Sequence, residues 1–114
     1  LMDCIFCKIV EKKIPSEIVY EDEQIMAFKD ADPQAPIHLL IIPKKHIASI
    51  MEVDKDDVAV INQIVKVAQL LVRQNNLDKK GFRLVLNTGK EGGQTVNHLH
   101  FHLIGGRFMT WPPG

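Results

Sequence analysis

The chain has 114 residues, of which 46% are hydrophobic and 25% are charged. This composition indicates a single globular domain with a buried core and excludes an intrinsically disordered chain. The 14 basic side chains balance the 14 acidic ones, so the formal net charge is zero. A neutral balance gives no electrostatic reason to bind nucleic acid or an anionic membrane surface, and we expect neither as a partner.

The sequence contains no sign of a membrane span or of secretion. No apolar run approaches the roughly 18 residues needed to cross a bilayer, and no basic stretch followed by an apolar one marks a signal peptide. With only two cysteines, a disulfide framework is excluded as well. We therefore expect one domain over residues 1–114, located in the cytoplasm.

The N-terminal half predicts one short helix and three strands. Apolar residues occur at helical spacing ahead of Pro15, whereas Pro33 and Pro36 require a loop over residues 31–36. A dense apolar run then ends at Pro43, as in a buried strand. The predicted helix covers residues 4–11, and the predicted strands cover residues 18–20, 25–28 and 37–42.

The C-terminal half predicts one long helix from about Asp54 to Gln74. Apolar residues recur there at helical spacing, and acidic residues at its start suit the positive end of the helix dipole. Strands are expected at residues 82–86 and 98–104, with a glycine-bearing loop at 88–94 between them. Because short strands surround a single long helix, we expect an α+β fold with an antiparallel sheet rather than repeated βαβ units.

Three of the five histidines alternate with large apolar residues in the last predicted strand. Side chains of a strand point alternately to its two faces, so His98, His100 and His102 would share one face. At the usual rise per residue they would lie roughly 6.5–7 Å apart, a spacing that suits a site entered by a phosphate. A structural metal site and an exposed polar stripe are the alternatives.

The segment 98–104 reads HLHFHLI and resembles the histidine-triad motif, in which histidines alternate with apolar residues. Together with the segments 30–38, 42–47, 87–96 and 105–114, it resembles the nucleotide-binding HINT branch of the histidine triad (HIT) family over essentially the whole chain. The resemblance implies a five-stranded antiparallel sheet with one long and one short helix, in a homodimer whose sheets join edge to edge. It also implies hydrolysis or transfer at the α-phosphate of purine nucleotides.

The expected chemistry falls on the histidines. A neutral imidazole is nucleophilic through one ring nitrogen when an acceptor holds the N–H of the other. His100 is the expected nucleophile, oriented either by a backbone carbonyl or by His38. His102 is expected to bind phosphate oxygens and to stabilise charge in the transition state. His38 and His98 complete the predicted catalytic set, although His38 would otherwise be an ordinary buried histidine.

The resemblance also assigns a set of nucleotide contacts. A carboxylate suits the two ribose hydroxyls, which is the role of Asp30, while glycine N–H groups and a hydroxyl suit a phosphate. Without the resemblance, each polar member would be an ordinary turn or capping residue and each apolar member part of the core. The predicted contacts are Ile5, Phe6, Phe28, Asp30, Asn87, Gly93, Gln94, Thr95 and Trp111.

Cys4 and Cys7 form a C-x2-C pair, which in a cytosolic chain is half of a metal site or a redox pair. The pair resembles part of a structural zinc site of bacterial HIT proteins, whose other two ligands correspond to His46 and His98. Two thiolates and two imidazoles suit tetrahedral Zn²⁺. Free thiols and a redox pair are the alternatives. With zinc on His98, more of the chemistry falls on the two later histidines, and no cofactor is expected in the chemical step.

The leading functional hypothesis is a purine nucleoside phosphoramidase that also cleaves acyl-nucleotides. It would act through a nucleotidyl-histidine intermediate and release a nucleoside monophosphate. A dinucleoside polyphosphate hydrolase is the closest alternative, and a nucleotide-binding regulatory or scaffold protein is the non-enzymatic one. The tail 111–114 reads WPPG and favours the first; Trp111 is expected at a dimer interface near the partner's site, unless the tail is a disordered end.

Overall fold

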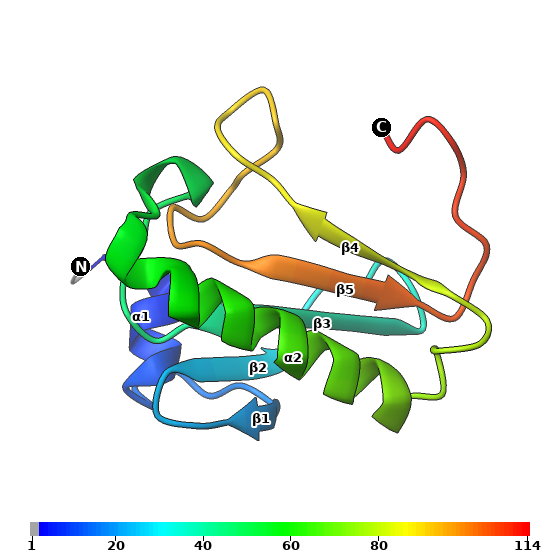
Figure 1. Cartoon of the computed structure of the whole chain (residues 1–114), viewed down its shortest axis with the longest axis horizontal. Coiled ribbons are helices and arrows are strands. Elements are labelled where there is room, and N and C mark those ends of the chain that lie inside the picture. The colour runs from blue at the N-terminus through cyan, green and yellow to red at the C-terminus, as the bar shows by residue number, and fades with distance from the viewer. Residues whose placement is uncertain (1–2) are drawn as a thin grey trace.

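The computed structural model describes residues 3–114 and shows a five-stranded sheet with a helix on each face (Figure 1). Neighbouring strands are antiparallel, in the order β1-β2-β3-β5-β4. The strands are β1 (Ile18–Glu21), β2 (Ile25–Lys29), β3 (Ile37–Pro43), β4 (Phe82–Leu86) and β5 (Phe101–Gly105). The helices are α1 (Ile5–Val10) and α2 (Val58–Gln74). The predicted α+β class, with one long and one short helix, is confirmed.

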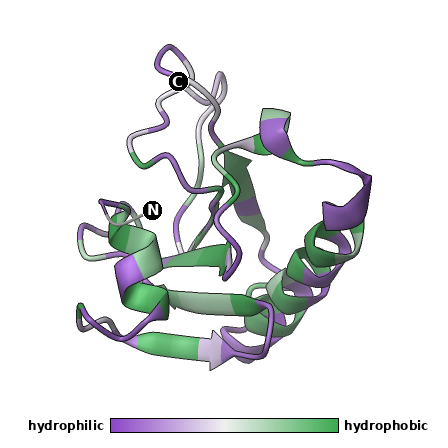
Figure 2. Cartoon of the chain, turned by 90° about the vertical axis from the view of Figure 1, so that its left-hand side faces the viewer, coloured by the Kyte–Doolittle hydropathy of each residue, from purple (hydrophilic) through white to green (hydrophobic). Residues whose placement is uncertain are grey.

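Strand β3 is the central strand and is buried on both faces. Leu39 and Ile41 pack with α2 on one face, whereas Leu40 and Ile42 pack with Phe6 of α1 on the other. Such a strand carries a continuous apolar run rather than alternating polar and apolar residues. Figure 2 shows the strands as mainly apolar and α2 as alternately apolar and polar along its length.

Helix α2 begins slightly later than its sequence predicts. Asp54 caps a short 3-10 turn, Lys55–Asp57, in a capping box with Asp57, and the α-helix starts at Val58. It ends at Gln74, as predicted, and buries Val60, Ile64, Val67, Ala68, Leu71 and Val72. Within residues 3–114, no helix has both the length and the apolar character required to span a membrane.

The carboxylate of Asp57 joins the start of α2 to the loop after β3. It accepts hydrogen bonds from Lys45 Nζ at 2.7 Å and from the Asp54 main-chain N–H at 3.2 Å. The bond from Lys45 is the main cause that holds the pKa of Asp57 below its usual value of 3.8. The ionised form therefore stabilises the fold at higher pH, and this contribution is lost as the pH falls below 3.8 through the folded pKa.

We expect the free energy of unfolding to fall less steeply below pH 3.8 in Asp57→Asn than in the unaltered protein. Urea denaturation at a series of pH values measures this slope. Asp56→Asn, an exposed neighbour in the same turn, is the matched control and should keep the original slope. Equal slopes for all three proteins would contradict the assignment.

The last strand begins at Phe101 rather than at the start of the predicted range 98–104. Ahead of it the main chain runs beside the loop after β3, where the Leu99 N–H donates to the Ile47 carbonyl. Of the three histidines in the motif, only His102 lies in a strand. The prediction was wrong here because alternating residues also occur in an extended segment that pairs with a loop.

Candidate functional site

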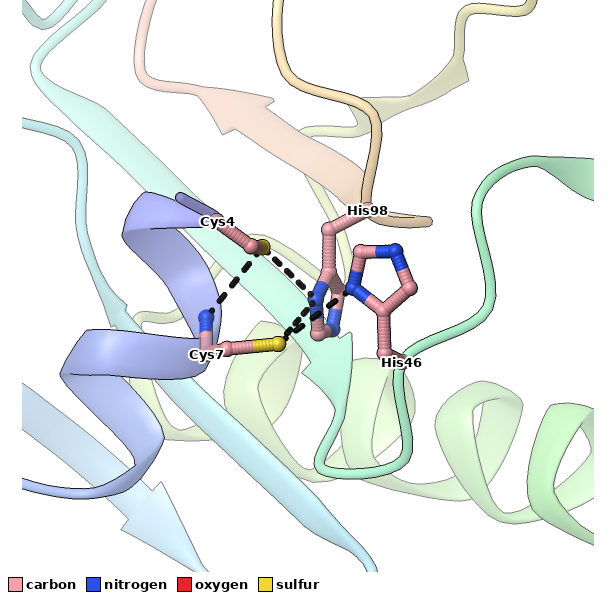
Figure 3. Close-up of side chains that lie close together, drawn as sticks. All are labelled: Cys4, Cys7, His46 and His98. Carbon is pink, nitrogen blue, oxygen red and sulfur yellow. Dashed lines mark hydrogen bonds between the residues drawn. The ribbon is translucent and has the colours of Figure 1, made fainter. Parts of the chain in front are cut away.

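Four side chains from three separate segments meet beside helix α1 (Figure 3). Cys4 is the N-cap of α1, Cys7 lies within it, His46 lies in the loop after β3, and His98 precedes β5. Their ligand atoms all lie within 4.8 Å of one another. Nδ1 of His98 lies 3.3 Å from Cys4 Sγ and 3.5 Å from Cys7 Sγ, and Nδ1 of His46 lies 3.3 Å from Cys7 Sγ. The structure brings together the four predicted metal ligands.

The hydrogen bonds around His98 leave the correct nitrogen free for a metal. Its Nε2–H donates to the carbonyl oxygen of Pro43 at 2.8 Å, so the lone pair is on Nδ1, which faces the two sulfurs. Burial lowers the pKa of His98 to about 4, so the ring is neutral at neutral pH. Two sulfurs and two imidazole nitrogens form a donor set that Zn²⁺ prefers in tetrahedral sites. The residues present therefore fit this ion.

Cys7 lacks the character of a reactive thiol. Both cysteines are free thiols. Without an ion, burial and the hydrogen bond that the Cys7 thiol donates to Cys4 raise the pKa of Cys7 to about 11. Reactive C-x2-C pairs have a lowered thiol pKa, because the thiolate is the nucleophile. The grouping of both cysteines with the imidazoles of His46 and His98 is the observation that favours metal binding.

The middle histidine of the motif, His100, is buried, and its ring is oriented by the residue two positions before it. Its Nδ1–H donates to the carbonyl oxygen of His98 at 2.7 Å, which leaves a lone pair on Nε2. The ring of Phe6 packs edge-on against His100, with centroids 5.1 Å apart, and against His98 at 5.9 Å. Of the two acceptors that the sequence left open for His100, the backbone carbonyl is the one used.

His102 contacts a second group of polar side chains. Its Nδ1 lies 2.9 Å from Nε2 of His38, which also lies 3.3 Å from Oδ2 of Asp30. The Gln34 main-chain N–H donates to the other ring nitrogen of His38 at 3.0 Å. The ring centroids of His102 and His100 are 5.0 Å apart. His38, His100, His102 and Asp30 therefore form one connected site.

Burial lowers the pKa of His102 to about 4, and the neighbouring His100 and His38 rings act in the same direction. An unfolded histidine with a pKa of 6.5 binds more protons than this folded one between pH 4 and 6.5, so stability rises with pH over that range. We expect a midpoint near pH 4 for His102 in an NMR titration, and a weaker pH dependence of unfolding in His102→Asn. A His102 midpoint near 6.5 would contradict this.

The predicted phosphate loop is held in place by one of its own members. The Gln94 side chain accepts from the Gly89 N–H at 3.0 Å and donates to the Ala48 carbonyl at 2.8 Å. Gly93 has a φ of 84°, which side-chain-bearing residues rarely adopt, and the Asn87 amide lies next to it. The side-chain amide of Gln94 is thus hydrogen-bonded to main-chain atoms of the protein. Gly93 allows the positive φ that the loop requires.

Five of the predicted nucleotide contacts differ in exposure. Phe6 and Phe28 are buried and pack edge to face with centroids 5.5 Å apart, in keeping with their core-packing alternative, although Phe6 also packs against His98 and His100. Ile5 and Thr95 line a cavity of about 370 Å³ that Cys4 and His46 also line. Trp111 lies on the surface with 83% of its area exposed.

Two main-chain groups at the site were not predicted from the sequence. The Gln34 N–H bonds to His38, and the Pro43 carbonyl bonds to His98. Main-chain atoms carry no side-chain pattern, so only their position beside or within β3 could have indicated them.

Comparison with known proteins agrees with this geometry. Residues 3–111 match a family model described as scavenger mRNA decapping enzyme C-term binding. The chain is 45% identical to a 14 kDa zinc-binding protein from Brassica juncea, over 98% of this chain and 100% of that protein. The crystal structure of a HIT family hydrolase from Legionella pneumophila matches with a TM-score of 0.96 and 53% identity, over 98% and 100% of the two chains. A histidine triad nucleotide-binding protein from Candida albicans matches with a TM-score of 0.83 and 34% identity, over 96% and 83%. The chain belongs to the histidine triad (HIT) family.

Proposed function

We propose that this protein is a nucleotide hydrolase that cleaves the bond between the α-phosphate and its leaving group in purine nucleoside 5′-phosphoramidates and acyl-nucleotides. The observation that carries the proposal is the hydrogen bond from His100 Nδ1 to the His98 carbonyl, because it leaves a nucleophilic lone pair on His100 Nε2. Relatives named as a HIT family hydrolase and a histidine triad nucleotide-binding protein support hydrolysis and a nucleotide ligand. The choice of purines and of nitrogen leaving groups follows the motif resemblance.

The reaction consists of two displacements at phosphorus. His100 Nε2 attacks in line and forms a bond to the α-phosphorus as the bond to the leaving amine breaks and the amine takes up a proton from solvent water. Water then attacks the same phosphorus and gives up a proton to solvent, the bond to His100 breaks with its electron pair returning to Nε2, and the nucleoside monophosphate leaves. His102 donates a hydrogen bond to a non-bridging phosphate oxygen and stabilises the transition state. The Asp30 carboxylate accepts hydrogen bonds from the two ribose hydroxyls.

Two substrates offered to the same protein test this proposal. We expect adenosine monophosphate to be released faster from adenosine 5′-phosphoramidate than from a diadenosine polyphosphate. The opposite preference would replace the proposal by dinucleoside polyphosphate hydrolysis. Tight binding of adenosine monophosphate without turnover of either substrate would indicate a regulatory or scaffold protein.

We further propose that Cys4, Cys7, His46 and His98 hold a structural Zn²⁺. The proposal rests on the donor set and on the free lone pair at His98 Nδ1, and the zinc-binding protein among the relatives supports it. Because the ligands come from three segments, the ion would join α1 to the loop after β3 and to the segment before β5. In this proposal the reaction does not proceed through the ion.

We also propose a homodimer formed through β4. This strand lies at one end of the strand order and exposes Phe82 and Leu84, with 45% and 37% of their areas accessible. An edge strand with exposed apolar side chains is a template for pairing with another strand. We expect light scattering to give the mass of two chains, and Leu84→Lys to give the mass of one. A single-chain mass for the unaltered protein would contradict the proposal.

A further inference from the structure

The main-chain N–H of Gln34 determines which nitrogen of His38 carries a proton. A main-chain N–H can only donate, so its 3.0 Å contact with His38 Nδ1 requires a lone pair on that nitrogen. The proton of the His38 ring is therefore on Nε2. A proton on Nδ1 would place two N–H groups against each other.

The same argument extends from His38 to His102. Nε2–H of His38 lies 2.9 Å from Nδ1 of His102, and two N–H groups cannot face each other at that distance. His102 Nδ1 therefore accepts, and the proton of the His102 ring is on Nε2. Oδ2 of Asp30, 3.3 Å from the same His38 nitrogen, is a second acceptor that favours a proton there.

His100 has the opposite arrangement. Its Nδ1–H donates to the His98 carbonyl, so its Nε2 carries a lone pair, whereas Nε2 of His102 carries a proton. The two rings are neighbours, with centroids 5.0 Å apart. A nucleophile needs a lone pair and a phosphate oxygen needs a hydrogen-bond donor, so the two Nε2 atoms suit different parts of one reaction.

The residue that carries this N–H is held in place by its own carbonyl and side chain. Arg107 Nε donates to the Gln34 carbonyl at 2.9 Å, and the Gln34 side chain donates to the Asp32 carbonyl at 3.0 Å. Pro33 and Pro36 restrict the backbone on either side. The loop between β2 and β3 therefore presents the N–H to His38 from a defined position.

We propose that the Gln34 main-chain N–H is a positioning group of this site, which acts through His38 to keep the proton of His102 on Nε2 and so makes His102 a hydrogen-bond donor. The use of that donor on a phosphate rests on the proposed function, whereas the proton's place does not. The same hydrogen bond disfavours a metal at Asp30, His38 and His102, whose ligand-type atoms lie within 4.8 Å of one another. A protonated His38 Nε2 has no lone pair to offer such an ion.

The test replaces Gln34 by its α-hydroxy acid analogue, which exchanges the N–H for an ester oxygen and keeps the side chain. In the unaltered protein, ¹⁵N NMR of labelled histidine should show a proton on His102 Nε2 and a lone pair on Nδ1. In the ester variant protons should shift from His102 Nε2 to His102 Nδ1, and the exchange should be partial because Asp30 Oδ2 still favours a proton on His38 Nε2. If the protein hydrolyses the phosphoramidate, kcat should also fall by on the order of 10²-fold, as on loss of a transition-state donor.

An ester at Ala31 is the matched control, because the structure shows no hydrogen bond from that N–H or to the preceding Asp30 carbonyl within residues 3–114. It should leave His102 unchanged. Gln34→Pro removes the same N–H by mutation and should shift the His102 proton in the same direction. If Gln34→Pro does not fold, the ester variant alone tests the inference. A proton on His102 Nδ1 in the unaltered protein, or no exchange in the ester variant, would overturn the inference. Because NMR needs no turnover, failure of the proposed function would be seen separately.

Discussion

Replacement of His100 by alanine is expected to lower kcat for adenosine 5′-phosphoramidate by about 10⁴-fold or more, as removal of a catalytic nucleophile does in other enzymes. In the proposed mechanism His100 Nε2 supplies the lone pair that forms the covalent intermediate, and alanine offers no replacement. Steady-state release of adenosine monophosphate measures the loss. Activity within tenfold of the unaltered protein would contradict a nucleophilic role for His100.

A denaturing quench during turnover provides an independent check of this first prediction. The unaltered protein should retain nucleotide covalently attached to a peptide that contains His100, and His100→Ala should retain none. His102→Ala is the matched control: it should still form the attached nucleotide, because this variant loses a donor but keeps the nucleophile. An unfolding curve for each variant shows that the loss does not come from a failed fold.

Zinc is expected to raise Tm by roughly 15 °C. Free ion at about 1,000 times its Kd stabilises a folded protein by about 4 kcal/mol, and each kcal/mol shifts Tm by about 4 °C for a domain of this size. Scanning calorimetry with zinc and with a chelator measures the shift. Because the Cys7 thiol has a raised pKa without the ion, zinc must displace its proton, and the shift should grow as the pH rises.

Cys7→Ser should abolish most of this zinc-dependent shift, since it removes one of the two sulfur ligands. Lys66→Ala, on the exposed side of α2, is the control and should keep the shift. A Tm that is independent of zinc in the unaltered protein, and equal in Cys7→Ser, would show that the cluster holds no structural ion.

The elements that the sequence predicts well are those whose pattern has a single structural explanation. The apolar run of β3 is continuous because the strand is covered on both faces, and the stripe of α2 follows the helical period because one side meets the sheet. The grouping of Cys4 and Cys7 with two histidines was also foreseen, since the resemblance supplied His46 and His98.

The start of β5 could not be read from the sequence. Alternation of polar and apolar residues indicates an extended chain, but it does not say whether that chain pairs with a strand or with a loop. The Leu99 N–H bonds to Ile47 in a loop, and this long-range contact decides the boundary. Similarly, an amide such as that of Gln94 suits a phosphate and a backbone carbonyl equally well, and only the fold shows that Ala48 takes it.

The protons of His38, His98 and His100 are set by bonds to main-chain atoms. These atoms are the Gln34 N–H, the Pro43 carbonyl and the His98 carbonyl. Alanine scanning leaves such groups in place, and so does divergence in which residue 34 changes to any amino acid other than proline. A homologue keeps this arrangement of protons as long as its backbone follows the same path through these three positions. Relatives can therefore share it while differing in side chains along the loop that imposes it.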